Sequence, residues 1–515
     1  MRRRTLCAAS ALAMMTPIPV SAFSFAEDEF DVVVAGAGGA GLAAALSAAE
    51  QGASVLLVEK MAAIGGNTLR ASGLFNASDP ARQEPMGITD SPSWHYEQTM
   101  ASGHGRNDPA VVRRFVCEAL PTLKWLESLG VRFMPETVAT WGAEWPRGHK
   151  PTQPRGQAYI RTLSSECIRR GVKIRTRCAM TRLLMKNGRA ASIEVEDLSS
   201  GRGKDKMIFH ARKAVILTAG GFAANPELVE SYRADLAGIP TDNNPGSTGE
   251  VMLEAIRAGA ASNALECIQC VPGAPEGRGF QVRLDLDAGR VLMVDGGGRR
   301  FIDEDGSRDG LAKAILARPR GSVWMVTDDG AVKAMDLRKL FKSTLNNRLH
   351  RNLACVIDKS SRSAKLKRAF EELPLISRKD VYRGLQTGDA LRADSWDALA
   401  LLMGVDADAL KDSVRVFNVE AGMGGGKCAR VRCLQLSEPP YWASRVVLNI
   451  HTTMGGLVIT PDAQVVGLDG KPVTGLFAAG EITGSVHGEN RMGGNGIADA
   501  LTFGRIAGRT AVLKR

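Results

Sequence analysis

Two short apolar strands, with a glycine-rich turn and an alanine-rich helix between them, are predicted near the start of the chain. The first strand begins at Asp31, the turn has the pattern G-x-G-x-x-G, and the second strand ends in an acid. In such units the first glycine makes the tight turn, the second lets the backbone approach a pyrophosphate, and the third allows the helix to pack closely. Free N–H groups at the helix start hold phosphates, and the acid accepts hydrogen bonds from a ribose. The pattern predicts a dinucleotide site at Gly36, Gly38, Gly41 and Glu59.

Apolar stretches that predict helices and strands continue beyond this unit, up to about residue 266. A helix is predicted over 108–130, with a break at Pro121, because proline removes a helical N–H and clashes with the preceding turn. Asn187-Gly188 joins two alternating strands and predicts a hairpin. Over 267–445, helices and long polar connections replace the earlier pattern, which indicates a second domain inserted into the first.

Composition excludes some classes of function. The chain has 515 residues, 44% of them hydrophobic, with 56 glycines and a net charge of +11. This length allows two or three domains with a large core. No aromatic-rich nucleic-acid motif accompanies the basic residues, so the charge favours an anionic small-molecule substrate or an acidic protein partner.

The nine cysteines are scattered along the chain. Cys267 and Cys270 form the one C-x-x-C pattern, and Val271 follows it where a c-type haem site needs histidine. The sequence therefore predicts no haem attachment. Two ordinary thiols near a domain boundary are favoured over a redox disulfide.

The segments after Glu59 indicate which dinucleotide is bound. With Gly65-Gly-Asn-Thr68 and Ala71-Ser-Gly73, the chain resembles the FAD-dependent flavoproteins of the fumarate reductase and succinate dehydrogenase family. More narrowly, it is similar to their soluble, periplasmic flavocytochrome c branch. No histidine for covalent attachment stands here, so the resemblance implies non-covalent FAD. It places further cofactor contacts at Gly66, Asn67, Thr68, Ser72, Gly73, Gly220, Glu250, Thr452, Glu481, Gly496 and Ile497.

The resemblance also implies an architecture. We expect an α/β protein with a Rossmann-like FAD-binding domain and an inserted α+β capping domain that closes over the substrate. The FAD-binding domain then covers 27–266 and 446–515, and the capping domain covers 267–445.

Three motifs of the same family carry the expected chemistry. They contain Arg308, His451 and Arg491, in Arg-Phe-Ile-Asp-Glu-Asp-Gly-Ser-Arg, His-Thr-Thr-Met-Gly-Gly and Val-His-Gly-Glu-Asn-Arg. By resemblance, His451 and Arg491 bind a substrate carboxylate, hydride passes from reduced flavin to the β-carbon, and Arg308 protonates the α-carbon. Arginine's planar fork of donors suits a carboxylate. As an acid it needs a relay and a closed site, because its pKa lies above about 12.

The chain departs from the family where a fumarate reductase holds the second carboxylate. Val271 stands at the position of the histidine that does so, and Leu284 and Asp287 stand at the Glu and Arg of the proton relay. Thr452 replaces a second histidine that often follows the first. One end of the predicted pocket thus keeps its carboxylate clamp, while the other end has become apolar.

These observations predict a flavoprotein that reduces the C=C of an α,β-unsaturated carboxylate. A monocarboxylic enoate of the acrylate, methacrylate, crotonate or aryl-acrylate type is favoured over fumarate. The alternatives are a fumarate reductase, a flavin-dependent ketosteroid-type dehydrogenase, and a non-catalytic flavin electron carrier. A ketosteroid enzyme would need tyrosines to bind the ketone. With five tyrosines in the chain and an intact Arg/His clamp, this alternative is less favoured.

Export and an electron donor complete the prediction. Residues 1–26 combine paired arginines with an apolar run that is too short to span a bilayer, which indicates a signal peptide. A twin-arginine signal is favoured over a Sec signal, because it exports proteins folded around a cofactor. We expect a periplasmic enzyme, not membrane-spanning, in anaerobic electron transport. The stretch 338–368 holds ten Lys/Arg against one acid and is a solvated face or a docking surface for a separate periplasmic cytochrome c.

Overall fold

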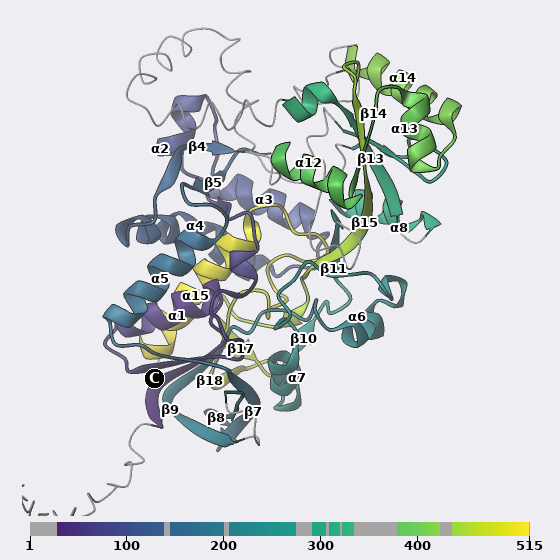
Figure 1. The fold of residues 1–515 in the computed structure, drawn as a ribbon. Helices are drawn as coiled ribbons and strands as arrows, with labels where there is room; N and C mark the ends of the chain where they lie inside the picture. The colour runs from purple at the N-terminus through teal and green to yellow at the C-terminus, as the bar shows by residue number, and fades with distance from the viewer. Residues whose placement is uncertain are drawn as a thin grey trace, which may run out of the picture.

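The computed structural model divides the chain into a larger α/β part and a smaller part beside it (Figure 1). It describes residues 28–138, 145–199, 205–273, 291–304, 308–319, 322–333, 378–422 and 435–513. The predicted signal peptide, the 338–368 stretch, Leu284 and Asp287 lie outside these residues.

The larger part is built on an eight-stranded sheet in the order β17-β18-β8-β9-β1-β2-β6, with β7 paired to β8. Its strands β18, β9, β1, β2 and β6 run parallel, and the central strand β1 is buried at its carboxyl end. Ligands of open parallel sheets bind at the carboxyl ends of such strands. The strands are β1 (Glu29–Ala35), β2 (Val55–Glu59), β6 (Lys173–Thr176), β7 (Cys178–Lys186), β8 (Arg189–Asp197), β9 (Lys206–Leu217), β17 (Gln464–Val466) and β18 (Pro472–Ala478).

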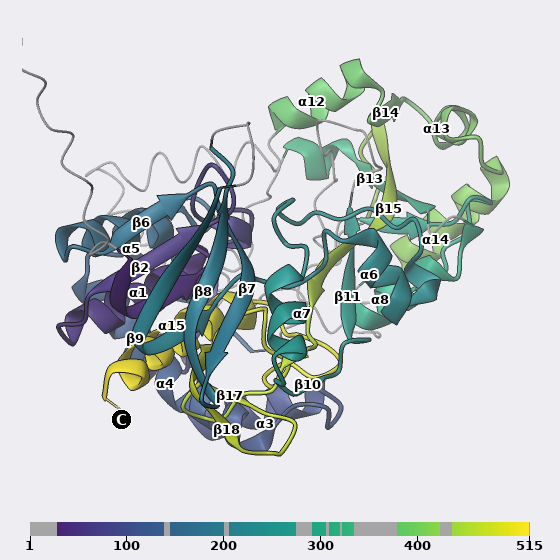
Figure 2. The same ribbon diagram turned by 90° about the horizontal axis from the view of Figure 1, so that it is seen from below.

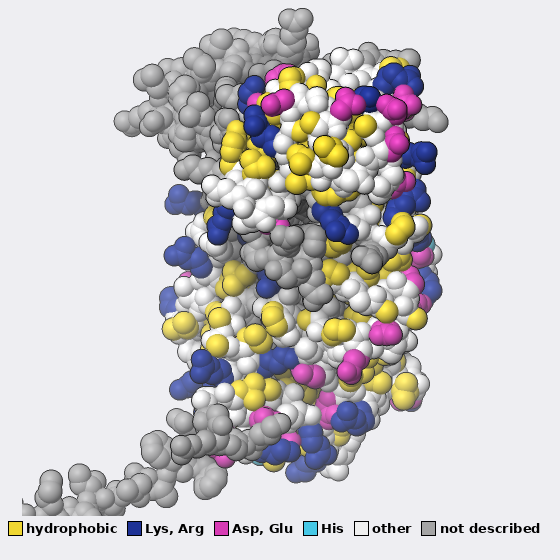
Figure 3. Space-filling model, turned by 45° about the vertical axis from the view of Figure 1, so that its right-hand side comes forward, with side chains coloured by type: hydrophobic (Ala, Val, Ile, Leu, Met, Phe, Trp, Pro, Cys, Tyr) yellow, Lys and Arg dark blue, Asp and Glu magenta, His cyan; other side chains and the backbone are white. Residues whose placement is uncertain are grey.

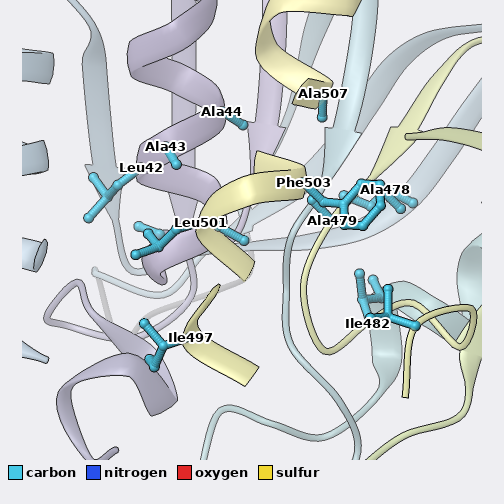
Figure 4. Packing of buried hydrophobic residues seen from close by; sticks show 14 of the residues in the cluster. Leu42, Ala43, Ala44, Ala478, Ala479, Ile482, Ile497, Leu501, Phe503 and Ala507 are labelled. Carbon is cyan, nitrogen blue, oxygen red and sulfur yellow. The ribbon is translucent and has the colours of Figure 1, made fainter. Parts of the chain in front are cut away.

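Two helices from opposite ends of the chain, α1 and α15, pack side by side against this sheet (Figures 1 and 2). The contact is close because small residues face each other. A Cβ on Gly504 would lie 2.4 Å from the Ala40 carbonyl oxygen, and one on Gly508 would lie 2.1 Å from that of Ala44. Figure 4 shows the alanine-rich core at this crossing. The helices of this part are α1 (Gly39–Glu50), α2 (Pro80–Gln83), α3 (Pro92–Ser102), α4 (Pro109–Ser128), α5 (Gln157–Arg169), α6 (Pro226–Tyr232), α7 (Glu250–Arg257) and α15 (Asn495–Leu513).

The smaller part has an antiparallel five-stranded sheet in the order β11-β15-β13-β12, with β14 also paired to β15. β15 is long: its first half pairs with β13 and β14, and its second half pairs with β11 and reaches the larger part. Helices α8 and α12 to α14 cover this sheet (Figure 1). These elements are β11 (Ile268–Gly273), β12 (Leu292–Val294), β13 (Ser322–Asp328), β14 (Ala390–Ala393), β15 (Tyr441–Thr453), α8 (Arg308–Leu316), α12 (Arg378–Thr387), α13 (Trp396–Met403) and α14 (Ala407–Gly422).

The remaining elements are short. A three-stranded sheet, β3-β5-β4, packs beside α15, and β10 pairs with β16. They are β3 (Phe75–Asn76), β4 (Phe133–Val138), β5 (Gly148–Pro151), β10 (Ser262–Asn263), β16 (Gly456–Leu457) and the 3₁₀ turns η2 (Gly66–Leu69), η3 (Glu84–Met86) and η4 (Ala234–Leu236).

The predicted α/β class, with a Rossmann-like domain and an inserted α+β domain, is confirmed. The hairpin at Asn187-Gly188 is also confirmed, with both residues at positive φ, as a two-residue turn of this type requires. The break at Pro121 is wrong, because α4 continues through it. The Asp108 side chain caps the helix start, and burial of residues such as Phe115 outweighs one missing hydrogen bond. Within the described ranges, no helix is both long and apolar enough for a membrane span.

Candidate active site

The three glycines of the turn between β1 and α1 differ in backbone conformation and in the space around them. Gly36 has φ +107°, and a Cβ there would lie 2.5 Å from the Thr218 carbonyl oxygen. A Cβ on Gly41 would lie 1.8 Å from the Gly36 carbonyl oxygen, so the helix could not start this close to the turn. Gly38 has φ −75° and ψ −171°, which any residue adopts, and its Cβ would meet no atom within 4 Å. A side chain at Gly38 would therefore extend into open space in front of α1.

This open space suits a pyrophosphate. The N-cap residue Gly38 offers no side-chain hydrogen bond, and the first turn of α1 contains no acid that would repel an anion. The Thr68 hydroxyl accepts the Gly39 N–H at 3.0 Å and fixes η2 beside the turn. A Cβ on Gly66 would lie 3.7 Å from the Gly38 Cα. The residues present thus fit a dinucleotide whose phosphates face the start of α1.

The Glu59 carboxylate stabilises the same turn by accepting hydrogen bonds from two backbone N–H groups. Its Oε2 accepts the Ala37 N–H at 2.8 Å, and its Oε1 accepts the Met61 N–H at 2.8 Å. Each carboxylate oxygen has a second lone pair that remains for a ribose hydroxyl. The cavity beside Glu59 is lined by two of the three predicted acids, with Gly36, Glu59, Lys60, Gly220, Glu250 and Met252 among its residues. The sequence predictions for Gly36, Glu59, Gly220 and Glu250 therefore meet in one cavity.

We expect Gly38→Val to weaken FAD binding at least tenfold, or about 1.4 kcal/mol, without unfolding the protein. The valine clashes with no protein atom but occupies the space in front of α1. The measurement is the flavin-to-protein ratio after purification, together with the FAD dissociation constant of the apoprotein. Gly296→Val is the matched control, because that exposed glycine also meets no neighbour and lies in the other domain. Full flavin content in Gly38→Val would contradict the assigned path of the pyrophosphate.

Asn67 joins four segments behind the turn. Its Nδ2 donates to Asn243 Oδ1 at 2.5 Å and to Glu481 Oε2 at 3.2 Å, and its Oδ1 accepts the Asn244 N–H at 2.7 Å. Glu481 Oε1 accepts the Thr453 N–H at 3.1 Å. The predicted cofactor residues Asn67 and Glu481 thus lie together, and they connect the first glycine turn to the end of β15.

The other predicted cofactor positions differ in their surroundings. Ser72 is exposed, and Gly73 packs on a neighbouring loop, where its Cβ would lie 2.3 Å from the Arg155 carbonyl oxygen. Thr452 is buried at the end of β15. Ile497 lies in the core beside α1 (Figure 4). Direct FAD contact by these four residues stays a prediction.

His451 is the extra residue of a β-bulge. Gln269 on β11 pairs with Thr452, and the next residue, Cys270, pairs with Ile450, so His451 has no partner across the strands. A bulge changes the direction in which a side chain points, and bulges are frequent beside active sites. The His451 Nδ1 lies 2.8 Å from Asp242 Oδ2, and its side chain is 31% exposed.

Arg491 lies in the segment just before α15. A Cβ on Gly496 would lie 2.8 Å from Arg491 Nη1, so this predicted glycine lets the guanidinium pack against the helix. The Arg491 Nε is buried without a hydrogen-bond partner among the described residues. Burial lowers the pKa of Arg491, and Glu481, Asp242 and Asp499 oppose this shift. A buried cationic donor of this kind fits an anionic ligand.

Arg308 is the first residue of α8 and comes from the smaller domain. Its charge acts on His451 together with that of Arg491: burial lowers the pKa of His451 most, Asp242 raises it, and the two guanidiniums lower it further. Two of the three predicted catalytic residues, Arg308 on α8 and Arg491 before α15, therefore lie within electrostatic reach of the third, His451 on β15.

Val271 lies on β11, two residues after Gln269, so both side chains share one face of the strand. Gln269 Nε2 donates to the Arg491 carbonyl oxygen at 3.0 Å and to Asn490 Oδ1 at 2.8 Å. Val271 is 6% exposed but belongs to none of the hydrophobic clusters of the described residues. Its face therefore turns toward the Arg491 segment. Cys267 and Cys270 are buried free thiols, as the favoured interpretation predicts.

Sequence reasoning missed Asp242 as the partner of His451. The position of Asp242 depends on a bridge between Thr241 and Ile450, which are 209 residues apart, and no local pattern encodes it.

Comparison with known proteins gives the chain its family. A family model described as FAD binding domain matches residues 31–497. The chain is 32% identical to fumarate reductase (cytochrome) of Shewanella frigidimarina, over 94% of this chain and 77% of that protein. It is 29% identical to NADH:acrylate oxidoreductase of Vibrio harveyi, over 94% of this chain and 50% of that protein. This chain thus spans about half the length of the second relative.

A solved structure agrees with these relatives. The open conformation of a flavocytochrome c3 fumarate reductase superimposes with a TM-score of 0.73 at 29% identity, covering 94% of this chain and 78% of that chain. The glycine turn, the acid after β2 and the cavity between them account for the cofactor of this group, FAD. The chain belongs to the FAD-binding flavoprotein family of the fumarate reductases.

Proposed function

We propose that this protein reduces the C=C of an α,β-unsaturated carboxylate and favours a monocarboxylic enoate over fumarate. The observation that carries the proposal is the Arg491 Nε, which is buried near His451 without a hydrogen-bond partner among the described residues, while Val271 lies on the adjoining strand. A carboxylate satisfies the buried donor at one end. An apolar substituent suits the valine at the other.

Each residue then has one task. Arg491 and His451 hold the substrate carboxylate and draw electron density from the conjugated double bond, which makes the β-carbon a hydride acceptor. Arg308, at the start of α8, holds the proton that the α-carbon takes up. Reduced FAD, when bound, supplies the hydride. Because Arg308 comes from the smaller domain, the complete set exists only where the two domains meet.

The substrate group opposite the clamped carboxylate determines which enoate the pocket favours. A second carboxylate against Val271 would be buried without a donor, at a cost of several kcal/mol. A methyl or aromatic group gains roughly 25 cal/mol per Å² of apolar area buried there. The names of the relatives include both fumarate and acrylate as substrates, so the family accommodates either end group. Fumarate reduction is the second candidate function, because the carboxylate clamp is common to both reactions.

Location and electron supply belong to the same proposal. The enzyme acts in the periplasm after export by the twin-arginine route, holds FAD non-covalently, and receives electrons from a separate cytochrome c. The division at 266/267 and 445/446 into FAD-binding and capping domains is retained, although the second boundary falls within β15. Figure 3 shows basic and acidic side chains mixed across one face of the described residues, so the visible charge favours no single docking patch there.

We expect an enoate to reoxidise the flavin of the anaerobically reduced enzyme, with methacrylate or cinnamate faster than fumarate. The measurement is the return of oxidised-flavin absorbance in stopped flow, with fumarate, acrylate, methacrylate, crotonate, cinnamate and urocanate as acceptors. Reoxidation by none of them, with full electron exchange with a cytochrome c, would favour the electron-carrier alternative. Reduction of the oxidised enzyme by a 3-ketosteroid would favour the dehydrogenase alternative.

A further inference from the structure

We propose that Asp242 is a positioning residue that couples enoate binding to the uptake of one proton by His451. The inference rests on the proposed function, because it requires that the ligand bring a carboxylate to His451. It goes beyond that function in assigning a role to Asp242 and a proton stoichiometry to the binding step.

Asp242 is held rigidly against the strand that carries His451. Its backbone N–H donates to the Ile450 carbonyl oxygen at 3.2 Å, and its own carbonyl oxygen accepts from Arg70 Nη1 at 2.8 Å. The neighbouring Thr241 also donates its hydroxyl to Ile450, and the Asn243 amide donates to the His451 carbonyl oxygen at 3.0 Å. These hydrogen bonds hold the backbone of Asp242 beside β15, so its carboxylate can leave the imidazole only by rotation of the side chain.

The contact fixes which nitrogen of His451 carries hydrogen. An ionised carboxylate only accepts, so the Nδ1 that lies 2.8 Å from Asp242 Oδ2 must donate. In the neutral imidazole, Nε2 then carries a lone pair. A substrate carboxylate also offers only lone pairs, and the two would repel. Hydrogen bonding to the enoate through Nε2 therefore needs the doubly protonated, cationic ring.

The charges around His451 affect the pKa of its imidazole, and so whether the second proton is bound. The facing groups are the Asp242 carboxylate from its loop, Arg491 from the segment before α15, and Arg308 from α8. Burial raises the pKa of the Cys270 thiol on β11 to about 12, so this group contributes no charge. Without ligand, burial lowers the pKa of His451 most, Asp242 opposes this shift, and the charges of Arg491 and Arg308 add to it. A bound enoate adds a second anion and reverses this balance, so the ring takes up a proton as the ligand binds.

The proton is not the one that the reaction consumes. It stays on His451 between the substrate carboxylate and Asp242, and it leaves when the product carboxylate leaves. The α-carbon receives its proton separately. The net reaction therefore remains one hydride and one proton added per double bond.

Oxidised enzyme tests the inference, because it binds an enoate without turnover. Methacrylate is titrated calorimetrically at pH 8 in two buffers of different ionisation enthalpy, which gives the number of protons taken up per flavin. We expect a value near one, and a dissociation constant that rises about tenfold per pH unit above the pKa of the free ring. Asp242→Asn removes the counter-charge and is expected to bring the uptake near zero, whereas Asp242→Glu restores part of it.

Asp235→Asn is the matched control. Asp235 lies in the same segment but is exposed and paired with Arg233, so we expect wild-type uptake. A merely structural role of Asp242 would weaken binding at every pH and leave the proton count unchanged. Binding without uptake in the wild type, or unchanged uptake in Asp242→Asn, overturns this inference alone. Absence of binding by any enoate overturns the proposed function and this inference with it.

Discussion

Replacing Arg308 with alanine is expected to lower kcat by two to four orders of magnitude while FAD stays bound. Loss of a general acid typically costs about this much, and Arg308 lies on α8, away from the glycine turn and the cavity beside Glu59. Arg308→Lys should recover only part of the rate, because an ammonium does not reproduce the guanidinium's planar donor geometry. The measurement is steady-state reduction of methacrylate with an artificial electron donor, together with the flavin content.

Lys313→Ala is the control for this variant. Lys313 lies on the same helix and is 70% exposed, so its loss changes the charge of α8 without entering the site. We expect near wild-type turnover from it. If Arg308→Ala also retained near wild-type turnover, Arg308 would have no part in proton delivery, and the acid would have to be sought elsewhere.

Exchanging Val271 for histidine is expected to shift the preference from monocarboxylic enoates toward fumarate. A wild-type preference of at least about 100-fold in kcat/KM would follow from the several kcal/mol that an unpaired buried carboxylate costs. Histidine supplies a donor and removes most of that cost, while the Arg491 clamp is unchanged. The measurement is kcat/KM for fumarate, methacrylate and cinnamate in both proteins.

Val271→Ala is the matched control, because it shortens the side chain and keeps the pocket end apolar. Its preference order should match that of the wild type, with weaker selection for cinnamate. A wild type that prefers fumarate would refute the apolar-end interpretation. A histidine variant with no change in preference would place Val271 outside the substrate pocket.

The sequence predicted the nucleotide unit well because its causes are local. The roles of Gly36 and Gly41 follow from a turn and a helix start within a few residues, and the structure shows the contacts that demand glycine there. The helix predicted from residue 108 also begins there for a local reason, because the Asp108 side chain accepts the Ala110 N–H at its start. The break at Pro121 was predicted incorrectly. The rule that proline interrupts a helix is local, and burial of α4 in the tertiary structure outweighs it.

The active site was predicted only in part, because its geometry comes from distant pairings. The family motifs identified His451, but its bulge depends on the register of β11 against β15. Asp242 reaches it only through the bridge from Thr241 to Ile450. Whether Val271 faces substrate likewise follows from the face that it shares with Gln269, which no pattern along the chain revealed.

The packing of α15 on α1 has a consequence for how the protein is made. The two helices are separated by almost 450 residues, so at about 5 to 20 residues per second the ribosome needs roughly 20 to 90 seconds between them. Throughout that time the alanine-rich face of α1 lacks the helix on which it packs in the folded protein. A nascent chain thus cannot form this helix pair until α15 has been made. Until then the apolar face of α1 is exposed, which favours non-native contacts in a partly folded chain.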